Sequence, residues 1–504
     1  MVKNLETLIN KKTKLLLIEA GSELEAGIPP NVAILVSAVR ISGYDVEVFS
    51  TNDYRHSETT GDEVRVGTLQ VPPINQKDII YAPKSTDMIS DFKIVVGRFK
   101  PDIIGISATE ATYLLGLDLL KSVNNPNITK IVGGAHSTLN PHDVINEKCV
   151  DAICVGEGEE ALVELCNSIE EGKIDYGIKN LWFKLDSRIV RNELRPLVNI
   201  DNIPFQDWSP WEIPPRASKP MAGKIRQTAL IELSRGCPFN CSYCANSFLN
   251  KEFKGNYRER SVDSFIDEVK LLRDKWGVEF IYVADETILT TKKSRFNEFV
   301  KKYAKVKLPF WCETRPESIT YERIRDLLDV GLLSINVGLE SGNQEFRKKI
   351  LNRNVKDEKI IYGIQEAVRA GAKVGANIII GFPGETRENI FETIELVKKA
   401  KPTSTMVHLF QPYGQTALRT ECIKMGLIPM DYICGDYRKD AIGTGEISAE
   451  ELRGLQRTFN LYIDLPKERW DEIKLAEYYT DEGNKKFCEL GREYQLKYFG
   501  KTNF

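Results

Sequence analysis

Residues Ser234 to Asn246 read SRGCPFNCSYCAN and place Cys237, Cys241 and Cys244 in a CxxxCxxC spacing. Three thiols on one short loop indicate a metal site. A cubic iron–sulfur cluster usually takes four cysteines, so a loop with three and no obvious fourth nearby would leave one iron open to another ligand. The alternatives are a zinc knuckle, which needs a fourth Cys or His at short spacing, and three buried thiols that act as small hydrophobic side chains.

The residues around this loop favour the cluster. Arg235 and Gly236 lead into it, Tyr243 directly precedes its third cysteine, and the apolar run Ala229 to Leu233 ahead of it reads as a strand. In these features the sequence closely resembles the radical S-adenosylmethionine superfamily. The resemblance implies that the three cysteines hold a [4Fe–4S] cluster and that Tyr243 belongs to the cofactor site.

Composition limits the class of protein. The chain has 504 residues, 42% hydrophobic residues and a formal net charge of -3, so it carries no basic excess that would attract nucleic acid. No apolar run approaches the roughly 18 to 20 residues that cross a bilayer, and the start MVKNLETLINKKTK lacks the apolar core of a signal peptide. Ten scattered cysteines form no disulfide framework. We expect a cytoplasmic protein with no membrane span.

The first part of the chain alternates strands and helices, which predicts a parallel doubly wound, Rossmann-like sheet. Between its second strand and the helix at Met88 to Phe99, the stretch from Ser50 to about Lys84 is polar and shows little periodicity. The expected strands are Lys14 to Ile18, Asp45 to Phe49, Ile103 to Ser107, Lys130 to Val132 and Ala152 to Val155, and the expected helices are Asn31 to Ser42, Met88 to Phe99 and Thr112 to Val123.

Small and polar residues follow these strands, at the edge where open parallel sheets bind ligands. Glycine there lets the backbone approach a ligand closely, although turns of any open sheet also need glycine. Ahead of a radical S-adenosylmethionine loop, such strand ends resemble the cobalamin-binding domain of the cobalamin-dependent branch of that superfamily. The resemblance implies a cobalamin site that includes Ser107, Thr109, Gly133, Gly134, Ala135, Gly156 and Glu157.

One element of that domain is missing. Cobalamin domains that supply an axial histidine carry Asp-x-His-x-x-Gly in the first loop, whereas Ala20 to Pro30 contains no histidine. We therefore expect bound cobalamin to lack a histidine ligand from this loop. His136 and His142 follow other strands and read as polar loop residues.

The second half of the chain predicts a partial (β/α)6 barrel with a helical C-terminal cap. Six strand-helix units begin with Ala229 to Leu233, and helical patterns follow Gly426. The predicted domains are a cobalamin-binding domain at residues 1–180, a hairpin and Pro-rich linker at 181–224, a barrel at 225–426 and a helical domain at 427–504. The expected later strands are Phe280 to Val283, Phe310 to Glu313, Ser334 to Val337, Lys373 to Ile380 and Thr405 to Phe410.

The carboxyl ends of these strands carry the residues that the resemblance assigns to S-adenosylmethionine. An acidic residue of the Asp285-Glu286 pair, of which Glu286 is our candidate, would meet its amino group, as suits a carboxylate and an ammonium. Arg315 would meet the methionine carboxylate, Glu340 and Ser341 the ribose, and Ile379 the adenine. Cys312, on the third strand, could also reach the site.

The resemblance implies a cobalamin-dependent methyltransferase that acts on an unactivated carbon of a small molecule or natural product. The cluster would receive an electron from a flavodoxin or ferredoxin and generate a 5'-deoxyadenosyl radical from S-adenosylmethionine, and methylcobalamin would supply the methyl group. A radical oxidation, cyclisation or rearrangement is the first alternative, and a non-catalytic sensor is the second. A methylthiotransferase is less favoured, because no cysteine precedes Cys149.

Overall fold

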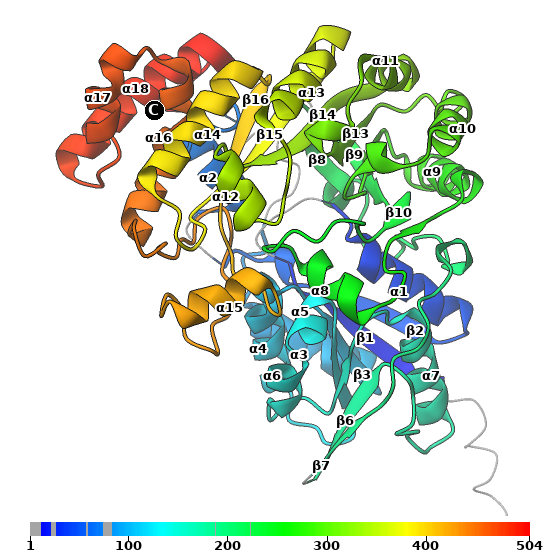
Figure 1. Ribbon diagram of the computed structural model, residues 1–504. Helices are drawn as coiled ribbons and strands as arrows, with labels where there is room; N and C mark the ends of the chain where they lie inside the picture. The colour runs from blue at the N-terminus through cyan, green and yellow to red at the C-terminus, as the bar shows by residue number, and fades with distance from the viewer. Residues whose placement is uncertain are drawn as a thin grey trace, which may run out of the picture. The chain divides into compact units, whose positions relative to one another are not determined.

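The computed structural model describes residues 12–21, 27–56, 59–73, 83–186, 188–221 and 223–503. The chain forms two compact units (Figure 1). Unit 1 comprises Met1–Ser57, Tyr81–Lys219 and Asp274–Gly277, and unit 2 comprises Glu58–Ile80, Pro220–Arg273 and Val278–Phe504. The sequence did not predict that the segment after the second strand belongs with the barrel.

Unit 1 is built on a seven-stranded sheet of order β2-β1-β3-β4-β5-β6-β7. The first five strands are parallel, as predicted. The predicted hairpin continues the same sheet, because β6 pairs antiparallel with β5 and with β7. The strands are β1 Lys14–Glu19, β2 Asp45–Ser50, β3 Ile103–Ser107, β4 Thr129–Gly133, β5 Ala152–Cys154, β6 Leu181–Leu185 and β7 Arg188–Arg191.

Helices α1, α3 and α4 of this unit confirm the three predicted helices, while α5, α6 and α7 were not predicted. Pro30 begins α1, where its missing N–H costs nothing, and the side chain of Asp87 caps α3 by accepting from the Ser90 N–H at 2.8 Å. The helices are α1 Pro30–Ile41, α3 Met88–Phe99, α4 Tyr113–Lys121, α5 Ala135–Leu139, α6 Pro141–Asn146 and α7 Glu159–Glu170.

The Pro-rich linker is fastened to the end of β1 by a buried charge. Glu19 accepts a hydrogen bond from the Trp211 indole at 2.9 Å and pairs with Arg216, and all three side chains are buried. Removing one member of such a pair would leave the other charge buried and unpaired. The linker tryptophans therefore pack within unit 1.

Unit 2 contains the predicted partial barrel, a second seven-stranded sheet of order β16-β15-β14-β13-β12-β9-β8. Strands β9, β12, β13, β14, β15 and β16 each pair in parallel with the next. Strand β8 lies beside β9 at the edge of the sheet. The strands are β8 Ser218–Met221, β9 Lys224–Ile231, β12 Phe280–Val283, β13 Phe310–Thr314, β14 Leu332–Glu340, β15 Lys373–Ile380 and β16 Ser404–Leu409.

Helices α9, α10, α11, α13 and α14 lie along one side of this sheet (Figure 1). In β13 to β16, residues that face the helices are fully buried and alternate with half-buried residues on the other face. We call this second face the concave face; Cys312 is fully buried and faces the helices instead. The helices are α8 Ala245–Glu252, α9 Val262–Trp276, α10 Lys293–Tyr303, α11 Tyr321–Val330, α12 Gln344–Lys349, α13 Asp357–Ala370, α14 Arg387–Ala400 and α15 Ala417–Lys424.

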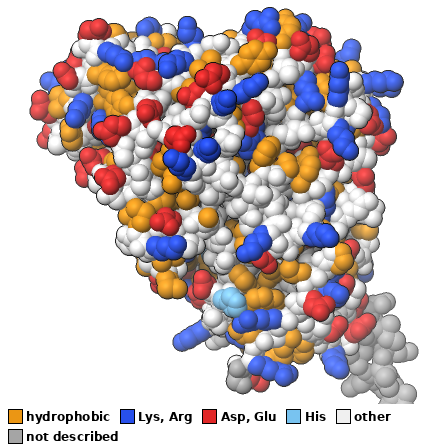
Figure 2. Space-filling view, in the orientation of Figure 1, with side chains coloured by type: hydrophobic (Ala, Val, Ile, Leu, Met, Phe, Trp, Pro, Cys, Tyr) orange, Lys and Arg blue, Asp and Glu red, His pale blue; other side chains and the backbone are white. Residues whose placement is uncertain are grey.

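The predicted C-terminal helices are α16 Ala449–Asp464, α17 Trp470–Leu475 and α18 Asp481–Phe499. Helix α16 packs against β16 and α14, so these helices continue along the open edge of the barrel. In the described part of the chain, no helix is long and apolar enough to cross a membrane. Lysine and arginine are interspersed with aspartate and glutamate over the visible face, which shows no basic patch (Figure 2).

The edge strand β16 is covered by an amide clasp, which we define as Gln70, Gln456 and Asn460. The Val407 N–H donates to Gln70 Oε1 at 2.9 Å, and Gln70 Nε2 donates back to the Val407 carbonyl at 3.1 Å. Gln456 donates to the same carbonyl at 3.0 Å, and Asn460 donates to the Leu69 carbonyl at 3.0 Å. Gln70 follows helix α2 Gly61–Gly67, so this segment satisfies backbone groups that a sheet edge leaves free.

We predict that Gln70→Ala destabilises unit 2, because the buried Val407 N–H loses its acceptor. The expected loss is about 1–3 kcal/mol in the free energy of unfolding. Thermal denaturation and amide exchange of the β16 peptide measure it. Gln365→Ala is the matched control, since Gln365 is exposed and its side chain donates to the Lys399 carbonyl at 3.0 Å. Unchanged exchange at β16 in Gln70→Ala would count against the clasp.

Candidate functional site

The three-cysteine loop leaves the carboxyl end of β9 and leads into helix α8. Its entry, β10 Ser234–Arg235, pairs antiparallel with β11 Arg258–Glu259. Asn250 of α8 donates to the carbonyls of Cys237 and Phe239, at 2.9 and 3.2 Å, and so closes the loop. Within the described residues no group of three His, Cys, Asp or Glu side chains is arranged to hold a metal ion.

Asp285 anchors the start of the loop. Its carboxylate accepts three hydrogen bonds of 2.8 Å, from the N–H groups of Leu233 and Ser234 and from the Ser234 hydroxyl. Burial nevertheless raises the pKa of Asp285 to about 7. Asp285 is thus fully used in holding the loop, which the sequence could not distinguish from a ligand-binding role.

Glu286, the next residue, remains open to a ligand. Its side chain is solvent-accessible, although burial by the surrounding protein raises its pKa. Because the Glu286 side chain is accessible to solvent, a ligand can reach its carboxylate. Asn246 hydrogen-bonds to Glu286, and its Nδ2 lies 3.7 Å from Cys244 Sγ. Of the two adjacent acids, the structure therefore leaves Glu286 free to bind a ligand near the cysteines.

The cysteines lie in a desolvated but not sealed environment. Cys241 is buried, and Cys237 and Cys244 are half-buried. Burial raises the pKa of Cys244 to about 12 and also raises the pKa of Cys237. Arg315 lies against the loop, with its Nη1 3.7 Å from Cys241 Sγ and its guanidinium 3.8 Å from the centre of the Phe239 ring. A metal is the partner that would stabilise the thiolates, since metal ligands must be deprotonated.

Glu340 ends β14 in an unusual backbone conformation. Its φ of 69° is in the left-handed region, which costs a residue other than glycine roughly 1–2 kcal/mol, and the register shifts between Gly338 and Glu340. Gly338 makes room for its side chain, because a Cβ there would lie 2.3 Å from Glu340 Oε1. Arg353 Nη1 lies 3.7 Å from the same oxygen, and Tyr243 also hydrogen-bonds to Glu340. Several neighbours therefore fix the position of Glu340.

Ser341 presents a buried hydroxyl that no described residue satisfies. The side chain is 0% exposed and its Oγ has no hydrogen-bond partner among the described residues. Its carbonyl accepts from buried Arg347 at 2.7 Å, which fixes the backbone. A buried hydroxyl without a partner is costly, and a ligand hydroxyl could supply the missing bond.

The apolar part of the site comes from the ends of β15 and the cluster loop. Ile379 and Tyr243 pack against the buried apolar cluster that contains Phe382 and Phe410. The ring centres of Tyr243 and Phe382 are 5.6 Å apart. Ile379 is half-buried on the concave face, so it can contact a flat ligand.

The Gly-Phe-Pro-Gly-Glu turn after β15 is closed on itself by Glu385. Its Oε2 accepts from the Gly381 N–H at 2.7 Å and from the Phe382 N–H at 3.3 Å. Its Oε1 is buried without a hydrogen-bond partner in the described part of the chain. Burial raises the pKa of Glu385 to about 8. Glu385 and Arg353 are positioning groups that the sequence did not reveal.

In unit 1, the predicted residues lie at the carboxyl ends of the parallel strands. Ser107 ends β3 and accepts from Asn31 at 2.8 Å, while Thr109 and Ala135 are exposed. Gly134 has a φ of 94°, and a Cβ there would meet the Ala108 carbonyl at 2.6 Å. A Cβ at Gly133 would lie 3.6 Å or more from the nearest atoms outside its chain neighbours. The packing of unit 1 therefore leaves room for a side chain at this position. This opening fits close approach of a ligand.

Other residues of unit 1 are engaged in the fold. The Glu157 carboxylate accepts from the Val198 N–H at 3.0 Å, and the Gly156 N–H donates to Thr138 at 3.0 Å. His136 is buried against Tyr113, with ring centres 4.2 Å apart. The first loop lies partly outside the described residues, which omit 22–26.

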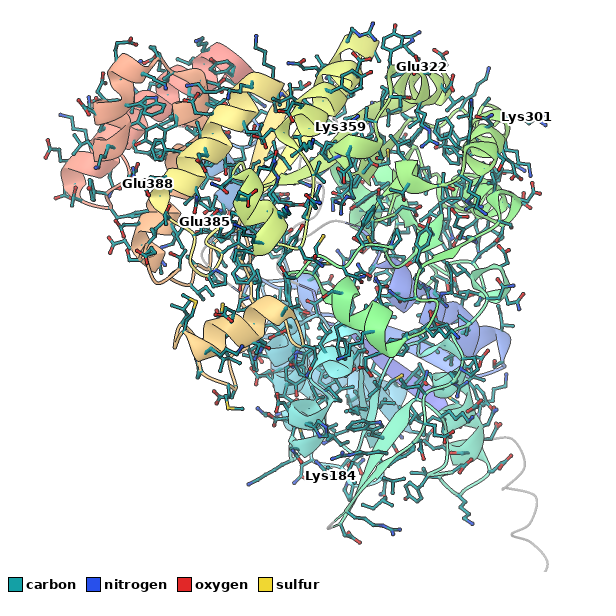
Figure 3. The ribbon with its side chains drawn as sticks, viewed as in Figure 1. Lys184, Lys301, Glu322, Lys359, Glu385 and Glu388 are labelled. Carbon is teal, nitrogen blue, oxygen red and sulfur yellow. The ribbon has the colours of Figure 1, made fainter. Side chains whose placement is uncertain are left out.

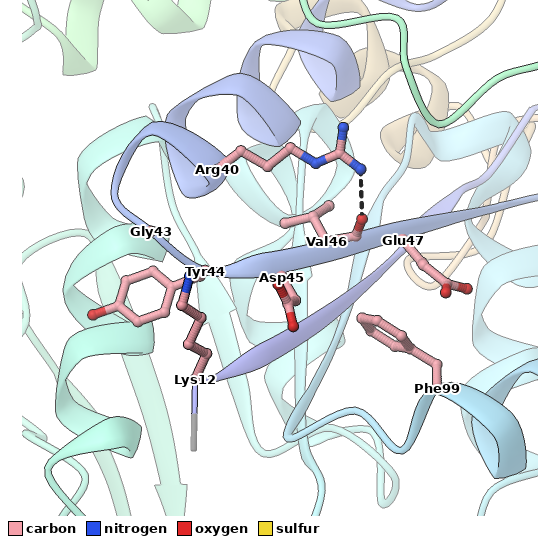
Figure 4. A pocket seen from close by; sticks show the side chains of 8 residues that line it. All are labelled: Lys12, Arg40, Gly43, Tyr44, Asp45, Val46, Glu47 and Phe99. Carbon is pink, nitrogen blue, oxygen red and sulfur yellow. Dashed lines mark hydrogen bonds between the residues drawn. The ribbon is translucent and has the colours of Figure 1, made fainter. Parts of the chain in front are cut away.

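A pocket in unit 1 lies at the opposite end of its sheet (Figure 4). It is lined by Lys12, Arg40, Tyr44 and Phe99 among others, and Arg40 donates to the Val46 carbonyl at 2.9 Å. Asp45, which also lines it, is the first residue of β2. Because ligands of open parallel sheets bind at carboxyl ends, this pocket is not the predicted cofactor site.

We predict that Glu385 makes the barrel less stable as the pH rises. A carboxyl whose pKa is raised on folding binds its proton more tightly in the native state, so stability falls between its unfolded pKa and about pH 8. Melting temperatures from pH 5 to 8 should therefore fall more steeply for the wild type than for Glu385→Gln. Glu388→Gln is the control, because hydrogen bonds lower the pKa of Glu388 and keep it ionised throughout this range (Figure 3). Parallel curves for the wild type and Glu385→Gln would refute the assignment.

Comparison with known proteins identifies both units. Residues 231–397 match the radical SAM superfamily, and residues 76–166 match the B12 binding domain. An uncharacterized methyltransferase of Pyrococcus horikoshii is 27% identical over 344 residues, which are 67% of this chain and 73% of the relative. An anaerobic magnesium-protoporphyrin IX monomethyl ester cyclase of Rubrivivax gelatinosus is 27% identical over 442 residues, which are 82% of this chain and 78% of the relative.

The fold agrees with a solved structure. The radical S-adenosylmethionine methyltransferase TsrM of Kitasatospora setae, solved with cobalamin and a [4Fe–4S] cluster bound, matches with a TM-score of 0.66 and 14% identity, over 96% of this chain and 100% of that one. This likeness confirms the expected fold class, and the matches to the two families confirm the expected cofactors. The chain is a cobalamin-binding radical SAM enzyme, whose cofactors are a [4Fe–4S] cluster, S-adenosylmethionine and cobalamin.

Proposed function

We propose that this enzyme is a methyltransferase that methylates an unactivated carbon of a small-molecule substrate. The observation that carries the proposal is the grouping, at one end of the barrel, of the cysteine loop with an accessible carboxylate and an unsatisfied hydroxyl, Glu286 and Ser341. These groups suit a ligand that has both an ammonium and ribose hydroxyls. The resemblance of the chain to relatives named methyltransferases supports the choice of reaction.

The residues of the barrel have separate tasks in this proposal. Cys237, Cys241 and Cys244 hold the cluster, and Glu286 accepts from the ammonium of S-adenosylmethionine. Arg315 offers its guanidinium to the methionine carboxylate. Glu340 and Ser341 bind the ribose, with Ile379 and Tyr243 against the adenine. None of these residues is assigned a bond-breaking role.

When bound, the cofactors supply radical generation and methyl transfer, while the protein contributes position and exclusion of water. Asp285 keeps the loop against β12, and Arg353 keeps Glu340 directed to the site through the 3.7 Å contact. Buried apolar residues around Phe382 keep water from the adenine side. In unit 1, the proposed cobalamin contacts are Ser107, Thr109, Gly133, Gly134, Ala135, Gly156 and Glu157. A flavodoxin or ferredoxin is the proposed electron donor.

A radical cyclisation or oxidation is the second candidate. It is favoured by one observation, the 27% identity over 442 residues to a protein named as a cyclase. The same cofactors could serve that reaction, and the barrel residues described above suit both. The products of the reaction separate the two candidates.

We predict that Gly133→Leu loses cobalamin without unfolding unit 1. A Cβ at this position meets no atom nearer than 3.6 Å, so the larger side chain would extend into the proposed ligand space. The measurement is the cobalamin content of protein purified with hydroxocobalamin, together with its circular dichroism spectrum. Gly133→Ala is the matched control and should bind cobalamin more tightly than Gly133→Leu. A Gly133→Leu protein with full cobalamin content would exclude the assigned contact.

We predict that each product molecule consumes two molecules of S-adenosylmethionine, one leaving as S-adenosylhomocysteine and one as 5'-deoxyadenosine. The product should be heavier by one methylene, as mass spectrometry of the reaction would show. Replacing Cys237, Cys241 and Cys244 together by Ala should abolish bound iron and 5'-deoxyadenosine formation, because the cluster loses its ligands. Formation of 5'-deoxyadenosine without S-adenosylhomocysteine or methylation would favour the cyclase or oxidase.

A further inference from the structure

The concave face of the barrel carries a polar and aromatic group that none of the cofactor roles uses. We define the Glu313 cluster as Tyr282, Trp311, Glu313, Asn336 and Asn377, all half-buried. These residues come from four neighbouring strands, β12 to β15. The strand register places Tyr282 beside Trp311 and Glu313 beside Asn336. The cluster is therefore one continuous surface inside unit 2.

Side-chain hydrogen bonds fix the polar half of this surface. The Trp311 indole donates to Asn336 Oδ1 at 3.3 Å, and Asn336 Nδ2 lies 3.5 Å from Asn377 Oδ1. Asn377 in turn hydrogen-bonds to the Glu313 carboxylate. Because the amide oxygens of both asparagines are occupied, each amide has a set orientation. The chain of bonds ends at Glu313, whose carboxylate has four lone-pair sites and keeps acceptor capacity for a ligand.

Glu313 differs from the other carboxylates of the site in its charge environment. Glu340 has Arg353 and Arg315 nearby, whereas no described cationic side chain forms an ion pair with Glu313. Burial, together with the negative charges of Glu286 and Glu340, raises the pKa of Glu313 to about 7. A desolvated carboxylate without a positive neighbour is costly, and a cationic ligand would remove that cost.

The other half of the cluster is a flat apolar wall. The rings of Tyr282 and Trp311 meet edge to face, with centres 4.3 Å apart and planes at 77°. The Trp311 N–H is held by Asn336, so the ring is fixed and its free edge and face remain for contact. Rigid aromatic surfaces bind planar apolar groups at little entropic cost. A ligand on this surface would meet the wall with one part and the carboxylate with another.

We propose that the Glu313 cluster is the substrate site and that it selects a substrate with a protonated amine beside an aromatic or planar apolar group. Glu313 accepts the ammonium, Asn377 keeps the carboxylate in place, and Tyr282 and Trp311 contact the apolar part. The proposal rests on the proposed function, because it names the substrate class of the same barrel. The other source of a cation is S-adenosylmethionine itself, and the experiment separates the two.

The test uses the reconstituted full-length enzyme with its cluster, cobalamin and S-adenosylmethionine, and phenethylammonium as the probe. Calorimetric titration compares this probe with the neutral 2-phenylethanol, which has the same shape. Wild type should bind the ammonium more tightly than the alcohol. Glu313→Gln should weaken ammonium binding at least about tenfold, the loss of a charge-assisted hydrogen bond. Glu313→Asp should recover part of it.

Glu322→Gln is the matched control, because Glu322 is an exposed carboxylate on α11 (Figure 3). It should bind both probes as the wild type does. Equal binding of ammonium and alcohol by the wild type, or an unchanged affinity in a folded Glu313→Gln protein, would overturn the proposal. In a separate titration, S-adenosylmethionine is left out of the starting mixture and is itself titrated into the enzyme. A tenfold loss there in Glu313→Gln would assign the carboxylate to the cofactor and also overturn the proposal, while the methyltransferase assignment would still stand on its product analysis.

Discussion

One buried carboxylate fixes the cysteine loop to the barrel. Asp285 accepts the N–H groups of Leu233 and Ser234 and the Ser234 hydroxyl, all at 2.8 Å. These contacts join the end of β9 to the end of β12, so the loop begins at a defined height above the sheet. Glu286, the next residue, takes no part in these bonds and is exposed. The placement of the cysteines and of the open carboxylate follows from this one set of bonds.

Several buried charged side chains of the barrel surround that loop. Glu340 has Arg353 as its counterion, and Arg315 pairs with Glu317 at 2.5 Å. Ion pairs of this kind rarely stabilise a protein more than an apolar core would, but they fix the geometry of each group. The site is therefore held in place by charge, and the apolar cluster around Phe382 supplies the packing. This arrangement is suited to precise placement of a charged ligand.

The sequence predicted most of the fold, because long apolar runs and helical periodicity are local signals. Helix α3 and strands β12 and β15 have the predicted bounds. The segment with α2 was not predicted, since it is held by the hydrogen bonds of Gln70 to Val407, a residue far away in the sequence. The same limit applies to the site. The motif indicated the cysteines, but nothing local distinguishes Asp285 from Glu286 or marks Arg353 as the partner of Glu340.

The amide clasp has a consequence for the history of the chain. One of the residues that close the barrel edge at β16, Gln70, comes from between β2 and α3, inside the sequence of the other unit, whereas Gln456 and Asn460 belong to α16. A gene fragment that began at the linker would encode every barrel strand. It would still leave the Val407 N–H without its acceptor, and the Val407 carbonyl would lose the hydrogen bond from Gln70. Exposed strand edges recruit strands from other molecules and promote aggregation. The two units therefore cannot be exchanged between proteins as simple consecutive modules: recombination at the linker would have to carry this early segment along with the barrel.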